Sequence, residues 1–232
     1  MELAPNLEIV DLSLWLKVEK ILVVGDFHLG YEEYLQNKGI LLPKQQLNQI
    51  IKRLKLILTQ TKPQIIIING DLKHDFGRNS RQEWKDVLKL IDFLKENCQE
   101  LIFIKGNHDN FLQTIAEQRQ IGVVEEYNIK NILITHGDKI SKTKAKLIII
   151  GHEHPAITLR DKSKVEKYKC FLKGKYKSAE LIVMPSFNLL LEGTDILKDK
   201  SLSPYLTNIK NFQVFIVSKG EAFDFGKVKD YC

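Results

Sequence analysis

The sequence has few cysteines and no long apolar run. Its three cysteines, Cys98, Cys170 and Cys232, lie far apart and form no Cys-x-x-Cys pair, which argues against a disulfide framework and against a thiolate zinc site. No apolar stretch approaches the roughly 18–20 residues of a membrane span, and the N-terminus lacks a basic region followed by an apolar run. We therefore expect a soluble, cytoplasmic protein with no membrane association.

Glycine and proline are also sparse, with 13 and 6 residues, and no Pro/Gly/Ser-rich linker, internal repeat or low-complexity segment divides the chain. The composition is that of a folded domain, with 44% hydrophobic and 28% charged residues among 232. A chain of this length buries roughly 70% of its unfolded surface and needs no staple to hold a core. We expect one domain spanning residues 1–232.

Short aliphatic runs alternate with amphipathic patterns, which indicates an α/β architecture. A helical stripe covers residues 44–60, a second helix follows Ser80, which forms a capping box with Glu83, and a third is expected at 111–118. Beyond residue 155 we expect strands and hairpins, with turns at Lys173-Gly174 and Lys219-Gly220. The predicted buried strands are 21–24, 65–68, 101–104, 132–134, 147–150 and 181–184.

Polar residues follow five of these strands. Five of the six histidines lie in these strand-end segments. One such histidine is usually an ordinary polar residue, but carboxyl ends of strands in an α/β sheet converge on one crevice, so five together predict one site. Imidazole, carboxylate and amide donors suit Mn²⁺, Fe²⁺ or Zn²⁺ better than an all-oxygen cage for Ca²⁺ or Mg²⁺. The five segments are residues 25–30, 69–71, 105–109, 135–138 and 151–154.

The order Asp-x-His, Gly-Asp, Gly-Asn-His-Asp, His-Gly and Gly-His-x-His resembles the calcineurin-like metallophosphoesterases, and within them the small archaeal SbcD-related and ligase-associated phosphoesterases. The resemblance implies a four-layer αββα sandwich of two mixed sheets. It also implies two divalent metal ions, with Mn²⁺ favoured and Fe²⁺, Zn²⁺ or Ni²⁺ as alternatives. The implied ligands are Asp26, His28 and His154 for the first ion, Asn107, His136 and His152 for the second, and Asp71, with its two carboxylate oxygens, as the bridge.

His108 is the histidine that the resemblance leaves uncoordinated. Two metals would lower the pKa of a bridging water, giving a hydroxide that attacks phosphorus. Histidine titrates near neutral pH, so His108 is the expected general acid for the leaving alkoxide. Several relatives orient this histidine with an Asp three residues after the bridging Asp, where this chain has His74. Asp75 or Asp109 could orient His108 instead, or His74 could itself face the substrate.

The net charge of +6 resides in one segment. Between Arg160 and Lys177 lie eight basic and two acidic residues, and the rest of the chain is balanced. Lysines interleaved with aromatic residues suit a phosphodiester backbone with stacking bases. A solvated lysine-rich hairpin is the alternative, and the excess of 30 Lys over 5 Arg weakens the argument for nucleic acid. The candidate substrate residues are Lys167, Lys173, Lys175, Lys177, Tyr168 and Tyr176.

The expected function is therefore metal-dependent hydrolysis of phosphodiesters, with single-stranded nucleic acid or nucleotides as candidate substrates. The alternatives are a phosphomonoesterase acting on a small metabolite and a non-catalytic metal-binding scaffold. The chain lacks an Asp-Arg-Gly block, and its Gly-Asn-His ends in Asp rather than Glu. Both features argue against a phosphoserine/phosphothreonine protein phosphatase. The segment 185–188, which ends another aliphatic run, could border the same crevice.

Overall fold

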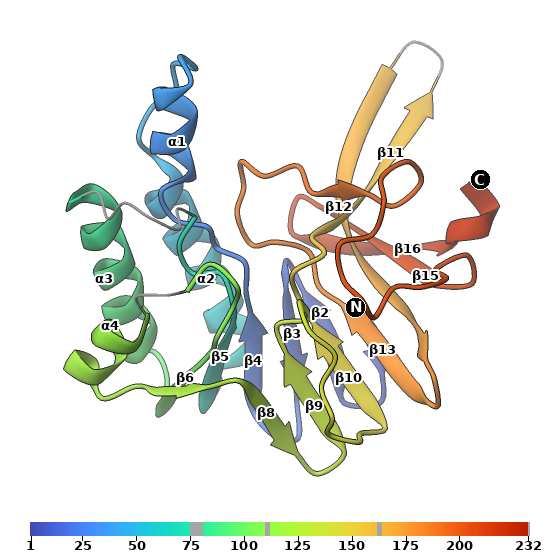
Figure 1. Ribbon diagram of the computed structural model, residues 1–232, viewed down its shortest axis with the longest axis horizontal. Coiled ribbons are helices and arrows are strands. Elements are labelled where there is room, and N and C mark those ends of the chain that lie inside the picture. The colour runs from blue at the N-terminus through green and yellow to red at the C-terminus, as the bar shows by residue number, and fades with distance from the viewer. Residues whose placement is uncertain (75–80, 110–111, 162–163, 232) are drawn as a thin grey trace.

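Two β-sheets packed face to face form the centre of the computed structural model, which describes residues 1–74, 81–109, 112–161 and 164–231 (Figure 1). The predictions that concern Asp75, Ser80, Phe111, Lys162 and Cys232 lie outside the described residues.

The first sheet has seven strands in sequence order. The strands β4 to β7 are parallel, so their carboxyl ends meet at one edge, whereas β1 to β4 pair antiparallel. Aliphatic side chains bury β4 on both faces, as the unbroken Ile-Leu-Val-Val run predicts. The strands are β1 Glu2–Ala4, β2 Leu7–Val10, β3 Ser13–Leu16, β4 Ile21–Val24, β5 Ile65–Asn69, β6 Glu100–Ile104 and β7 Gly122–Val124.

Helices cover the outer face of the first sheet (Figure 1). The stripe Ile50, Leu54 and Ile57 of α2 is buried against it, which confirms the predicted amphipathic helix. One helix was not predicted: α1 buries no residue and projects from the body of the molecule. The helices are α1 Tyr31–Asn37, α2 Gln46–Thr61, α3 Arg81–Lys95 and α4 Leu112–Arg119.

The second sheet has nine strands and is organised around the long strand β12, which pairs with β11, β13 and β15. Strands β9, β10 and β13 run parallel to one another. A 3₁₀-helix, Val228–Tyr231, follows the last strand. The strands are β8 Glu126–Ile129, β9 Ile132–Thr135, β10 Leu147–Ile150, β11 Pro155–Asp161, β12 Lys164–Tyr176, β13 Ala179–Val183, β14 Thr194–Asp195, β15 Gln213–Ser218 and β16 Glu221–Lys227.

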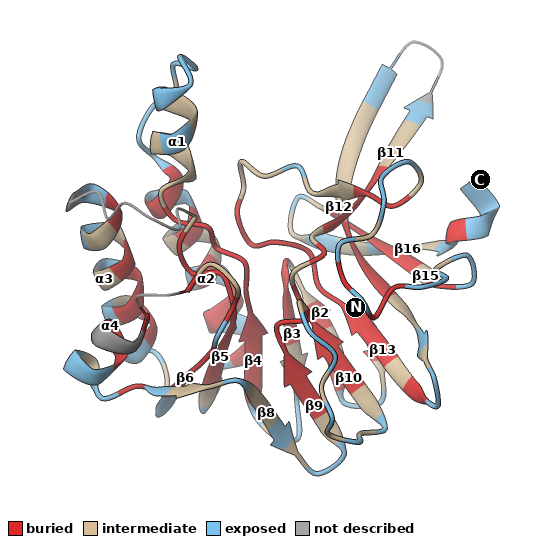
Figure 2. Ribbon diagram, viewed as in Figure 1, coloured by how far each residue is buried: buried red, intermediate tan, exposed pale blue. Residues whose placement is uncertain are grey.

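One apolar core joins the two sheets, so the predicted sandwich is confirmed. Ile134, Ile149 and Phe187 from the second half of the chain share it with Val24 and Phe103 from the first. A second apolar cluster lies on the outer face of the second sheet, where residues 196–212 cover it. Figure 2 shows the buried residues concentrated in the strands and on the inner sides of the helices.

The two predicted turns have different outcomes. Lys219-Gly220 joins β15 to β16 with φ of 50° and 84°, the left-handed pair that a two-residue hairpin turn needs. The prediction of a turn at Lys173-Gly174 was wrong, because both residues lie inside β12. Gly174 is needed there for close approach, since a Cβ would collide with the ring of Phe212.

Candidate metal centre

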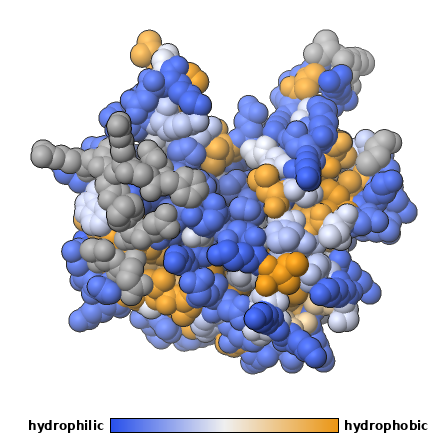
Figure 3. Space-filling model, in the orientation of Figure 1, coloured by the Kyte–Doolittle hydropathy of each residue, from blue (hydrophilic) through white to orange (hydrophobic). Residues whose placement is uncertain are grey.

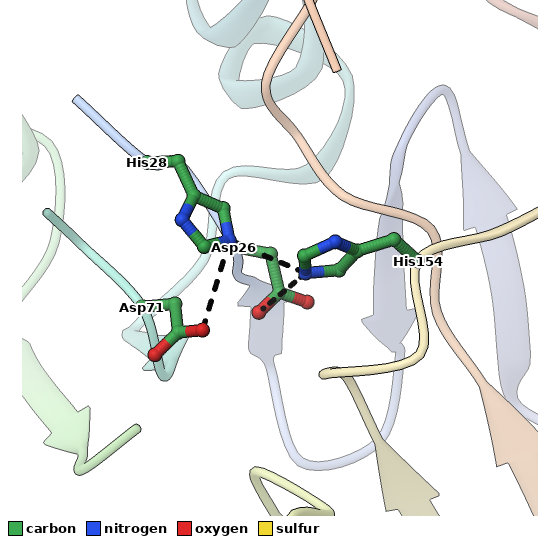
Figure 4. Close-up of side chains that lie close together, drawn as sticks. All are labelled: Asp26, His28, Asp71 and His154. Atoms are coloured by element: carbon green, nitrogen blue, oxygen red, sulfur yellow. Dashed lines mark hydrogen bonds and ion pairs between the residues drawn. The ribbon is translucent and has the colours of Figure 1, made fainter. Parts of the chain in front are cut away.

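The predicted ligands come together at the carboxyl ends of five strands. Loops after β4, β5, β6, β9 and β10 carry them, as the rule for strand ends in α/β sheets predicts. Four of their side chains point toward one another in Figure 4. Two groups of metal-ligating atoms result, and Asp71 belongs to both.

The first group joins Asp26, His28, Asp71 and His154. The Nε2 atoms of His28 and His154 lie 3.3 Å apart, and His154 Nε2 lies 3.3 Å from Asp26 Oδ1. His28 Nε2 lies 3.6 Å from Asp71 Oδ2. Asp26 and Asp71 are almost completely buried, so their charges need a compensating cation.

The second group joins Asp71, His136 and His152, with Asn107 beside them. The Nε2 atom of His136 lies 3.0 Å from Asn107 Oδ1, 3.2 Å from His152 Nδ1 and 3.5 Å from Asp71 Oδ2. The same Oδ2 of Asp71 therefore faces both groups. Its Oδ1 instead accepts the backbone N–H of His108 at 3.0 Å, so a single oxygen is placed between the groups, rather than the two on which the sequence argument relied.

Strained backbone holds this arrangement. Five of the grouped residues have left-handed φ angles between 43° and 63°, a region that residues other than glycine rarely adopt. Close packing adds a second constraint, because a Cβ on Gly70 would collide with His136 and one on Gly106 with Asp71. The residues with left-handed φ are Asp26, His28, Asp71, His152 and His154.

The buried carboxylates stay ionised. Burial opposes the charge of Asp26, but His154 and His136 outweigh it and hold its pKa below the ordinary value. Burial likewise opposes the charge of Asp71, and hydrogen bonding and charge from His136 lower its pKa well below the usual range. Burial and the neighbouring His154 lower the pKa of His28 to about 3, which leaves that imidazole neutral and able to bind a metal.

The donor atoms fit divalent cations. With metal–ligand distances of about 2.0–2.2 Å, two adjacent ligands of one octahedral or tetrahedral ion lie about 2.8–3.6 Å apart. The separations given above, 3.0 to 3.6 Å, match these edges. His136 Nε2 can offer one proton at most, yet Asn107 Oδ1, His152 Nδ1 and Asp71 Oδ2 all lie within 3.5 Å of it. Among the described residues, none donates a hydrogen bond to the buried Asp26 Oδ1. A cation in each group would satisfy these atoms.

His108 lies beside the cluster, and a main-chain carbonyl orients it. Its Nδ1 lies 2.8 Å from the carbonyl oxygen of His74, so Nδ1 carries the proton of that hydrogen bond, and Nε2 is the nitrogen on the opposite side of the ring. The ring of His108 also meets the ring of His28 edge to face, with centroids 5.2 Å apart.

Asp109, one of the residues that could orient His108, accepts hydrogen bonds from two main-chain N–H groups. Its Oδ1 accepts the N–H of Leu72 at 3.0 Å and its Oδ2 the N–H of Gly106 at 2.9 Å. Burial, with the charge of Asp71, raises the pKa of Asp109 to about 6. The side chain thus ties together the loops that carry Asp71 and His108.

The segment 185–188 donates hydrogen bonds to the main chain of two residues of the first group. Ser186 Oγ donates to the carbonyl of Asp26 at 2.7 Å, and Asn188 Nδ2 donates to the carbonyl of His28 at 3.1 Å. Lys169 Nζ donates to the carbonyls of Ser186, at 2.7 Å, and of Asn188. Burial and the charge of Arg53 lower the pKa of Lys169 to about 7. Sequence reasoning missed this role of Lys169, because only the pairing of β12 brings it beneath the site.

The six candidate substrate residues do not form one patch. Lys167 donates to the carbonyl of Gly193 at 2.6 Å, and the Tyr168 hydroxyl donates to Glu166. Both lie in the part of β12 that pairs with β11, which begins directly after His154.

The other four lie farther along β12. In the strand register, Lys175 lies opposite Glu180, and Glu180 lies opposite Leu147 at the end of β10 remote from the metal-binding loops. Lys173 Nζ forms an ion pair with Glu180 Oε1 at 2.9 Å. Tyr176 packs on Tyr205, and Lys177 lies over the Tyr176 ring. The charge that is contiguous in sequence is therefore divided along a 13-residue strand.

Comparisons with known proteins identify the family of the chain. The family model described as calcineurin-like phosphoesterase matches residues 19–143, more than half of the chain. Nuclease MPE of Pseudomonas putida is similar in structure, with a TM-score of 0.67, 18% identity and 94% of each chain covered. The phosphoesterase Yfce of E. coli gives a TM-score of 0.42 and 12% identity over 89% of this chain and 98% of its own. No curated protein matches the sequence. The chain belongs to the calcineurin-like phosphoesterase family, and its two-sheet sandwich is the fold of that family.

Proposed function

We propose that this protein is a dinuclear metal-dependent phosphodiesterase acting on nucleotide-containing esters. The observation that supports it most is the pair of donor groups that share Asp71, with seven candidate ligands gathered from five loops. Asp26, His28, Asp71 and His154 would hold one divalent cation, and Asp71, Asn107, His136 and His152 the other. Bound cations at such a pair of sites supply a nucleophilic water at neutral pH and neutralise charge on the phosphate.

His108 is the proposed general acid. The hydrogen bond from Nδ1 to the carbonyl of His74 fixes the ring so that Nε2 can deliver a proton to the leaving oxygen. Asp109 has the role of a positioning residue, because it braces the loop that carries His108. The chain is proposed to act as one unit over residues 1–232, since the core shared by the two sheets leaves neither sheet independent.

The preference for a diester rests on the surroundings of the cluster. Helix α1 and the β11–β12 hairpin project on the same side of the molecule as the metal-binding loops (Figure 1), with a notch between them in the space-filling view (Figure 3). A phosphodiester carries an organic group on each side of the phosphate, and two flanking surfaces suit it.

None of the described helices is long and apolar enough to cross a membrane.

The test compares bis(p-nitrophenyl) phosphate with p-nitrophenyl phosphate and with a nucleoside diester after reconstitution with Mn²⁺. We expect the diester to be the better substrate, whereas faster hydrolysis of the monoester would favour a phosphomonoesterase. His108→Ala should slow hydrolysis of the nucleoside ester by about 10²–10⁴-fold and that of the p-nitrophenyl ester less, because p-nitrophenolate hardly needs a proton. Equal losses on both would make His108 a binding residue.

A further inference from the structure

A continuous run of aromatic rings leads away from the metal-binding cluster. The rings of His74 and His108 stack at 16° with centroids 6.1 Å apart. Beyond them, the rings of Tyr31 and Tyr34 meet the His74 ring edge to face at 4.7 and 4.8 Å. The two tyrosines stack on each other at 21°, with centroids 5.7 Å apart. The ring of His74 therefore connects both tyrosines to His108.

Packing of the core does not account for these tyrosines. Both belong to α1, a helix that buries none of its seven residues. Tyr34 is 38% exposed, although burial of a tyrosine ring contributes a large favourable free energy to folding. Glu32 anchors the helix by accepting the backbone N–H groups of Gln45 and Gln46 at the start of α2. The main-chain anchor at Glu32 thus holds α1 in place without using the tyrosine rings.

A positive charge accompanies the rings. Lys38 Nζ lies 4.4 Å from the centre of the Tyr34 ring, a cation–π contact at the end of α1. Partly exposed aromatic rings next to an ammonium group that can meet a phosphate are the combination that binds single-stranded nucleic acid without sequence preference. A small aliphatic phosphate ester would leave both features unused.

We propose that Tyr31, Tyr34 and His74 form an aromatic platform on which a base next to the scissile phosphate stacks, which makes single-stranded nucleic acid the substrate class. The proposal rests on the proposed function, because it takes the metal-binding cluster as the place of hydrolysis. Of the three platform rings, that of His74 stacks on His108, so the stacked base sits on the side where His108 protonates the leaving oxygen. Stacking on one such ring changes affinity by about 5- to 150-fold per base.

The platform is tested by binding, which needs no turnover. Fluorescence anisotropy with EDTA present compares a labelled octamer of thymidine with an octamer of abasic tetrahydrofuran units, which has the same charge and no bases. We expect Tyr34→Ala to weaken binding of the thymidine octamer at least about fivefold and to leave the abasic octamer unchanged. Tyr34→Phe, which keeps the ring, should bind like the unmodified protein. Tyr231→Ala is the matched control, since Tyr231 is also 38% exposed and lies in the C-terminal 3₁₀-helix.

Equal affinity of the unmodified protein for the two octamers would overturn the platform, as would equal losses on both in Tyr34→Ala. Hydrolysis of bis(p-nitrophenyl) phosphate by the same preparations, with Mn²⁺, separates this failure from failure of the proposed function. A protein that hydrolyses the small diester but does not prefer bases keeps the function and loses the platform. Base-dependent binding without any ester hydrolysis would keep the platform and overturn the phosphodiesterase.

Discussion

The substitution Asn188→Ala tests whether the segment behind the metal-binding cluster shapes it. Asn188 is fully buried and holds both sides of a bend: its Nδ2 donates to the carbonyl of His28, and its Oδ1 accepts the N–H of Leu190 at 2.8 Å. The His28 carbonyl keeps two other donors, Gln46 Nε2 at 3.3 Å and the N–H of Tyr31 at 3.2 Å. The main loss is therefore the acceptor of two N–H groups, those of Leu190 and, at 3.3 Å, Leu191. The strained backbone of His28 also loses one of its hydrogen bonds.

Each buried polar group left unpaired costs about 1–3 kcal/mol, so we expect the free energy of unfolding to fall by an amount in this range. Groups that orient a ligand typically contribute 10–100-fold to metal affinity. Mn²⁺ affinity at the group containing His28 should fall by about that factor, and the other group should change less. The assays are urea unfolding with EDTA and calorimetric titration with Mn²⁺.

Asn208→Ala is the control, because Asn208 is exposed and accepts a local hydrogen bond from the N–H of Lys210. Its free energy of unfolding should change by less than about 0.5 kcal/mol. If Asn188→Ala binds two Mn²⁺ ions with unchanged affinity, the segment 185–188 does not position the ligands and the reasoning fails.

Two further predictions concern lysines. Between pH 7 and about pH 10 the unfolded chain retains the Lys169 proton that the folded chain has released, since burial lowers the folded pKa to about 7. The free energy of unfolding should therefore rise with pH by up to about 1.4 kcal/mol per unit relative to Lys169→Met, and parallel urea-unfolding profiles would contradict this. In the basic segment, we expect neutralisation of Arg160 and Lys164 of the hairpin to weaken the salt dependence of oligonucleotide binding. The slope of log K against log salt concentration, measured by anisotropy, should decrease in magnitude by about 0.7 for each phosphate contact that these side chains make. Neutralising Lys175 and Lys177, at the remote end of β12, should not alter that slope, and an equal effect of both pairs would refute the division of the segment.

The sequence was most informative where one local pattern determines one structure. All six predicted strands formed, and residues 21–24 and 147–150 have the predicted bounds, because unbroken aliphatic runs need burial on both faces. The strand-end motifs converged because parallel strands end at one edge. Strands β1 to β3, β7 and β8 were missed. Helix α1 was missed as well, because it lacks an apolar stripe and is anchored through Glu32.

Features that depend on pairing over long sequence distances were not predictable. The turn at Lys173-Gly174 looked like a hairpin, but Gly174 is there to admit Phe212, which lies far along the chain. The orientation of His108 depends on a main-chain carbonyl of His74, which side-chain types cannot reveal. The basic segment looked like one patch, yet the length of β12 separates its ends.

Metal content tests the central claim most directly. After removal of metals and reconstitution with Mn²⁺, elemental analysis should find two ions per chain. Asp71→Asn should lose this stoichiometry together with most diesterase activity, because an amide cannot offer an oxygen both to the two donor groups and to the N–H of His108. Asp92→Asn, at an exposed ion pair with Arg119, should keep both ions and full activity. One ion or none in the unmodified protein, or two ions with near-normal turnover in Asp71→Asn, would contradict the dinuclear site.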